Sequence, residues 1–148
     1  MDRLLEYAAS IGVSVAFIDG LDPHHPGRFS QARRHIDVLD GMMRIKTECA
    51  LAHELGHATL MHEPTIFAHV AAKQERAADA WAAHFLIDNT EYQYAEQKYG
   101  TRTDWIAQEL GVLQRLVDAY ECTLTKLGDT VYVGAQLGSC RGRFESVA

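Results

Sequence analysis

The 148-residue sequence has few cysteines and no long apolar run. Its three cysteines, Cys49, Cys122 and Cys140, are an odd number without a CxxC pair. This argues against a disulfide framework and favours a reducing cytoplasm. No apolar stretch approaches the roughly 18 residues of a membrane span, and the first residues lack the charged-then-apolar layout of a signal peptide. We therefore expect a cytoplasmic protein that has no membrane partner.

Positive charge is also scarce, because 14 Lys and Arg stand against 20 Asp and Glu, a formal charge of −6. Broad binding to nucleic acid or anionic lipid needs an excess of basic residues, so this charge disfavours both. The hydrophobic content of 47% and charged content of 23% are typical of a globular protein, and the length fits one domain. Eight histidines make metal binding the first chemistry to consider.

Hydrophobic periodicity predicts an α+β fold, mostly helical with a small β-sheet. Alternating apolar residues predict strands at 13–18 and 35–39, and a loop rich in glycine and proline over 19–30. A connection is expected over 64–72, and a last strand over 130–133. Apolar spacings of three and four predict helices over 2–10, 42–62, 73–88, 91–98, 103–110 and 112–125.

A metal-binding pattern, HExxH, lies inside the helix predicted over 42–62. His53 and His57 are one turn apart on the same face, which suits a tetrahedral Zn²⁺ bound at about 2.0–2.1 Å. Glu54 is poorly placed as a ligand but well placed to take a proton from a water molecule at the metal. Gly56 costs a helix about 1 kcal/mol relative to Ala, so we expect another element to pack closely there.

The next predicted helix offers Glu75 and Asp79, which share a face because they are four residues apart. A catalytic zinc site has three protein ligands and a fourth position for water, and Glu75 is the expected third ligand. Asp79 is then expected to accept a hydrogen bond from the far nitrogen of a ligating histidine. The alternative is that the two carboxylates only form a solvated acidic face.

These two helices together resemble the ImmA/IrrE metallopeptidases. That family pairs an HExGH helix with a helix of the form E-x-x-A-[ND]-x-[FW]-A-A-x-x-L. Here the segments are HELGH at 53–57 and ERAADAWAAHFLI at 75–87. The strand at 35–39 and the segment 106–112 also fit, so the resemblance covers residues 1–126. Residues 127–148 are then a C-terminal extension.

The resemblance implies a zincin-like domain that works as a zinc metalloendopeptidase, with His53, His57 and Glu75 on the metal and Glu54 as the catalytic residue. Family members are common in bacteria, phages and integrative elements. The implied substrate is a protein, such as a phage-type repressor or another transcriptional regulator. The alternative is a zinc-binding regulator or toxin–antitoxin component that acts by protein binding without proteolysis.

Residues 101–126 have the spacing of a helix-turn-helix, but their charges disfavour direct DNA binding. Three basic residues stand against four acidic ones in this subregion, a sum of −1. We expect a helical bundle that covers the core or docks a protein substrate.

Other side chains near the motif have structural explanations. Cys49 is expected to be a small buried residue, and His62 to lie at the wrong angle for a ligand, near the helix end. The group that stabilises the oxyanion stays open among four residues, His69, His84, Tyr92 and Tyr94.

Overall fold

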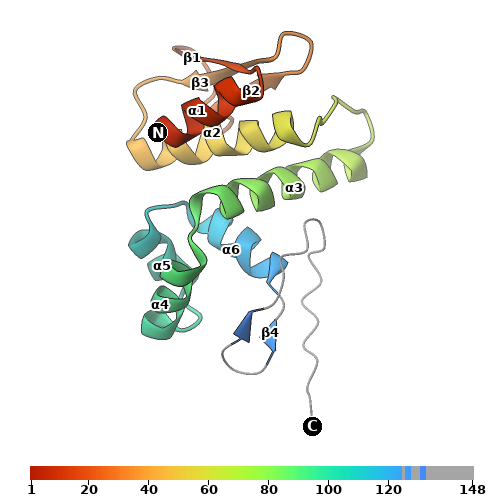
Figure 1. Cartoon of the computed structure of the whole chain (residues 1–148). Coiled ribbons are helices and arrows are strands. Elements are labelled where there is room, and N and C mark those ends of the chain that lie inside the picture. Colours follow the sequence, from red (N-terminus) through yellow and green to blue (C-terminus); the bar gives the residue numbers. More distant parts are fainter. Residues whose placement is uncertain (125, 128–130, 133–148) are drawn as a thin grey trace.

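The computed structural model describes residues 1–124, 126–127 and 131–132. A small sheet lies at one side, followed by α1 (Asp2–Ser10) and α2 (Arg44–Thr59), then α3 (Ala68–Leu86), as Figure 1 shows. The far side is formed by three shorter helices, α4 (Asn89–Tyr99), α5 (Thr103–Leu110) and α6 (Gln114–Thr123). The predicted α+β class, mostly helical with a small sheet, is confirmed.

The sheet has three strands in the order β1-β3-β2. β1 (Ser14–Ile18) pairs in parallel with β3 (His35–Leu39), and β2 (Gly27–Ser30) pairs antiparallel with β3. β2 is therefore an edge strand, and it lies beside α2. Residues 27–30 had been expected as part of a loop, and that expectation was wrong because the strand forms only through its pairing with β3.

α2 is buried on most sides because the sheet covers one face and α3 the other. The helix suits this place because its side chains between 49 and 58 are mostly small or apolar. α1 lies alongside it. The N-terminal ammonium bonds Glu48 at 2.7 Å, and Tyr7 bonds Thr59 at 3.2 Å. These two contacts, one near each end of α2, fix the position of α2 relative to the N-terminal segment.

α2 and α3 approach very closely at Gly56. A Cβ atom added at Gly56 would lie 2.8 Å from the Ala78 carbonyl oxygen and 3.0 Å from its Cα. Because the obstacle is backbone, it cannot be relieved by turning a side chain. The close packing expected at this glycine is thus confirmed, and it brings the residues of α3 that follow Lys73 over the metal-binding face of α2.

α4, α5 and α6 form a bundle against α3. α6 packs on α3 through its buried residues, which include Leu116, Val117 and Tyr120. The Asp88 carboxylate caps α4 by accepting hydrogen bonds from the N–H groups of Thr90 and Glu91. The apolar face of α6 thus covers the core.

All six predicted helices are confirmed; α1 and α5 have the predicted ends, and the other four have shifted ends. The largest shift is in α3, which begins at Ala68, whereas residues 64–72 had been expected as a connection. The stretch Ala68–Ala72 contains three alanines, which are good helix formers. β5 (Val131–Tyr132), paired with β4 (Lys126–Leu127), falls within the strand expected at 130–133, whose other residues lie outside the described part.

No helix among the described residues is both long and apolar enough to cross a membrane. The division at residue 126 stays a prediction, since most of the 127–148 extension lies outside the described residues.

We expect Gly56→Ala to destabilise the fold by about 1–3 kcal/mol, even though alanine is the better helix former, because the new methyl group overlaps the Ala78 backbone. Urea unfolding of the metal-free protein measures this change. Ala72→Gly at an exposed site of α3 measures the helix-propensity contribution alone. A Gly56→Ala protein as stable as wild type would contradict the close approach of the two helices.

Candidate metal centre

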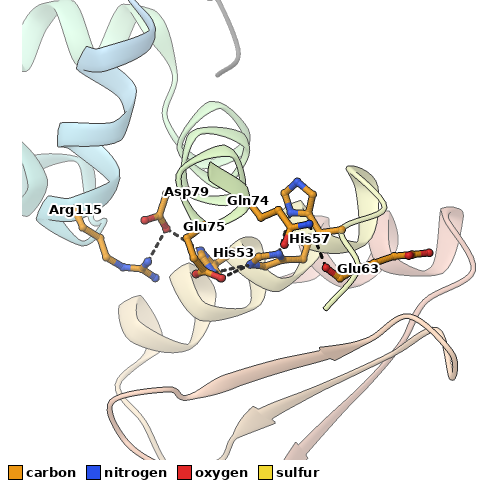
Figure 2. Close-up of polar contacts among 8 residues, drawn as sticks. His53, His57, Glu63, Gln74, Glu75, Asp79 and Arg115 are labelled. Carbon is orange, nitrogen blue, oxygen red and sulfur yellow. Dashed lines mark hydrogen bonds and ion pairs between the residues drawn. The ribbon is translucent and has the colours of Figure 1, made fainter. Parts of the chain in front are cut away.

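Three side chains converge where α2 faces α3 (Figure 2). His53 and His57 project from α2, and Glu75 reaches them from α3. Their Nε2 atoms are 3.1 Å apart, and the Glu75 carboxylate oxygens are 3.2 Å from His53 Nε2 and 3.4 Å from His57 Nε2. This is the group in the described part of the chain that could hold a metal ion.

The spacing fits a tetrahedral ion. Zinc bonds of about 2.0–2.1 Å at tetrahedral angles place neighbouring ligand atoms about 3.3 Å apart. All three separations lie close to that value. Two imidazoles and one carboxylate are also a donor set used by catalytic zinc sites, which leave a fourth position open. The residues present therefore fit zinc.

The outer nitrogen of each ligating histidine is held by a second residue. His53 Nδ1 donates to Asp79 Oδ1 at 2.7 Å, as expected from the sequence. His57 Nδ1 lies 3.0 Å from His62 Nδ1. With Nε2 of His57 bound to a metal ion, its Nδ1 would carry the proton and donate it to His62. Both ligand rings are thereby oriented toward the metal position.

His62 reaches this position because of the backbone after α2. Met61 adopts a left-handed conformation with φ of 52°, which is uncommon for a residue other than glycine. The turn that results is closed by a hydrogen bond from the His62 N–H to the His57 carbonyl at 3.0 Å. The expectation from helix geometry that His62 is no ligand stays a prediction, and its contact with His57 was not predicted.

Asp79 has a second partner on α6. Arg115 Nη1 lies 2.5 Å from the same Asp79 oxygen that accepts the His53 proton (Figure 2). At the start of α6, the Leu113 N–H also contacts the sulfur of Cys49 at 3.4 Å. Cys49 is buried, as expected, and burial raises the pKa of its thiol. The helical bundle is thus bonded directly to the metal centre.

The charges of the ligands are strongly coupled in the metal-free protein. Burial alone would lower the pKa of His53, but the hydrogen bonds that its ring donates to the Asp79 and Glu75 carboxylates outweigh burial and raise the pKa to about 9. The same contacts with His53 and His57 hold the pKa of Glu75 well below its usual range. A proton on His53 therefore occupies the place that a metal ion would take.

Glu54 lies between α2 and the edge strand β2. Burial raises the pKa of its carboxyl group, whereas the neighbouring His53 and His57 lower it. The backbone N–H of Phe29 donates a hydrogen bond to it. A Cβ atom at Gly27 would lie 2.6 Å from Glu54 Cγ, so glycine there leaves room for the side chain.

An open cleft of about 1360 Å³ runs over this centre. One wall is formed by residues 23–33, including β2, and the floor by α2. The other wall comes from α3, the loop that precedes it and the start of α6. All three ligands and Glu54 line the cleft, so an extended chain can reach them.

The structure brings together all five site residues expected from the sequence: His53, Glu54, His57, Glu75 and Asp79. Their chemical roles stay predictions. None of the four oxyanion candidates is among the described residues that line the cleft. Tyr92 instead bonds Glu121, and His84 bonds Thr123.

Residues 9–119 match the family model of the IrrE N-terminal-like domain, Peptidase_M78. The match spans three quarters of the chain and contains every residue of the metal centre. None of the curated proteins matches.

We expect Asp79→Asn to lower zinc affinity about 10- to 100-fold, and His62→Ala about tenfold, because each change frees a ligand ring to rotate. Competition with a chromophoric chelator measures both values. Glu63→Gln is the matched control, since Glu63 lines the cleft but its side chain holds no ligand. Wild-type affinity in Asp79→Asn would contradict its orienting role.

The metal-free protein should lose stability as pH rises. The folded pKa of His53, about 9, exceeds its ordinary value of 6.5. The resulting stabilisation is complete below pH 6.5 and is lost as pH passes through 9, a change on the order of 3 kcal/mol. Urea unfolding in chelator at a series of pH values measures it. Asp79→Asn should flatten the profile, and an unchanged slope would assign it to other groups.

Proposed function

The chain belongs to the IrrE N-terminal-like domain family, Peptidase_M78, and we propose that it is a zinc-dependent metalloendopeptidase. The observation that carries this proposal is the convergence of His53, His57 and Glu75 at separations of 3.1–3.4 Å. The open cleft beside them supports a polypeptide substrate, since its volume of about 1360 Å³ exceeds the roughly 300–1,000 Å³ of small-molecule sites.

The chemistry divides between the metal and Glu54. Bound zinc supplies a Lewis acid, which polarises a carbonyl group and lowers the pKa of water toward about 7. Glu54 takes the proton from the attacking water molecule and delivers it to the leaving amine. Its raised pKa brings the carboxyl group closer to the pH at which it must both accept and release a proton.

The backbone of the edge strand β2 supports the assignment of Glu54 as the catalytic base. Pro26 accepts a hydrogen bond from the Leu39 N–H, so in the alternating antiparallel ladder Gly27 and Phe29 direct their backbone groups away from β3. The Phe29 N–H holds the Glu54 carboxylate there. An extended peptide beside β2 would have its backbone next to Glu54.

The proposed substrate is a protein, and the resemblance to the ImmA/IrrE metallopeptidases favours a phage-type repressor or another transcriptional regulator. The location proposed for this reaction is the cytoplasm. Direct DNA binding is not proposed, because α6 turns its apolar face to the core and Arg115 to Asp79.

We expect Glu54→Gln to reduce cleavage by about 10²- to 10⁴-fold while zinc content stays at the wild-type level, because glutamine cannot accept the proton. The substrates are the regulator encoded beside this gene and a mixed peptide library. Metal content is measured by mass spectrometry. His57→Ala is the matched control, and it should lose both zinc and cleavage.

Three outcomes would change the proposal. Cleavage that survives in Glu54→Gln would remove Glu54 as the base, and loss of zinc in that variant would make it a ligand. If zinc-loaded wild type cleaves neither substrate, the chain is a zinc-binding regulator or toxin–antitoxin component that acts by protein binding.

A further inference from the structure

The cleft has the opposite charge character to the whole chain. The formal charge is −6, yet the cleft is lined by four cationic side chains and only three carboxylates. Two of these carboxylates, Glu54 and Glu75, belong to the metal centre. Glu63 is the third. The cationic residues that line the cleft are Arg28, Arg33, Lys46 and Arg115.

These cations differ in how far they are neutralised. Arg115 is paired with Asp79. Arg28 and Arg33 share one buried carboxylate, Asp37, at 2.8 and 3.6 Å, and both guanidinium groups are more than half exposed. One carboxylate cannot balance two cations, so this part of the rim keeps a positive charge.

Lys46 is the cation with the most freedom. It is exposed, lines the cleft and has no ion pair within the described residues. It lies on the metal-binding face of α2, since Ala50, one turn further, also lines the cleft, and His53 follows three residues later. Its ammonium group is thus available to a ligand in the cleft.

The distance from Lys46 to the metal centre corresponds to a few peptide residues. His53 follows Lys46 by seven positions in the helix, a rise of about 10 Å along α2. An extended peptide advances about 3.3 Å per residue, so about three residues cover this distance. The cleft continues to this end of α2, where Met42 and Leu113 also line it.

We propose that the cleft selects acidic polypeptide segments, and that Lys46 contacts a carboxylate side chain three or four residues from the cleaved bond. This inference rests on the proposed peptidase function. The positive rim attracts such a segment, whereas the net negative surface elsewhere repels it, so binding is directed to the cleft. Met42 and Leu113, which line the same cleft as Lys46, suit apolar side chains near the acidic residue.

The first experiment profiles cleavage. Zinc-loaded full-length protein digests a synthetic peptide library, and mass spectrometry identifies the cleaved bonds. Wild type should prefer Asp or Glu at the third or fourth position from the bond, and Lys46→Glu should shift the acidic-to-basic ratio there roughly tenfold. Lys73→Glu makes the same charge change at an exposed position outside the cleft and should leave the ratio unchanged. A wild type without this preference, or a preference that survives Lys46→Glu, would overturn the proposal.

The second experiment measures binding without catalysis. Zinc-loaded Glu54→Gln is titrated with two labelled decapeptides that differ only in having Glu or Lys at the tested positions. The Glu peptide should bind more tightly, and its advantage should shrink between about 0.05 and 0.5 M NaCl because salt screens the contact. If wild type cleaves nothing but this preference depends on Lys46, the peptidase function fails and the charge selection stands. Equal binding of both decapeptides would refute the charge selection, whatever the cleavage result.

Discussion

The close approach of α2 and α3 at Gly56 is the constraint on which the metal centre depends. With no side chain between the two backbones, Glu75 reaches both imidazoles although it comes from a different helix. Asp79 lies one turn further along α3 and therefore meets the outer nitrogen of His53. A wider separation would leave a pair of histidines without their third ligand. Gly56 thus lowers the helix propensity of α2 but allows Glu75 to approach both histidines.

From this contact a continuous chain of polar bonds leads to the bundle of short helices. Asp79 accepts from His53 and from Arg115 through the same oxygen, so the position of α6 and the orientation of a metal ligand are coupled. The Leu113 contact with Cys49 adds a second link one turn before His53. The bundle therefore helps to position the residues of the metal centre, and it also covers the core.

The sequence predicts those parts of the site whose geometry is local. His53, His57, Glu75 and Asp79 follow from helical spacing, and the resemblance relates the two helices to one ion. The role of His62 depends on the left-handed backbone at Met61, which the hydrophobic periodicity of the sequence does not predict. β2 and Arg115 were missed for a different reason, because β2 is ordered by its pairing with β3 and Arg115 bonds Asp79, which lies 36 residues earlier in the chain. Contacts between distant residues thus decide β2 and Arg115, whereas a local turn decides His62.

Metal binding and the charge of the cleft are linked. The carboxylates of Glu54 and Glu75 both lie at the metal position, and two ionised carboxylates carry a charge of −2. A bound zinc ion, with its double positive charge, would balance these two carboxylates. The exposed cations of the rim, Lys46 foremost, are then no longer opposed from within the cleft. Loading with zinc would therefore supply the Lewis acid and also strengthen the proposed attraction for an acidic polypeptide.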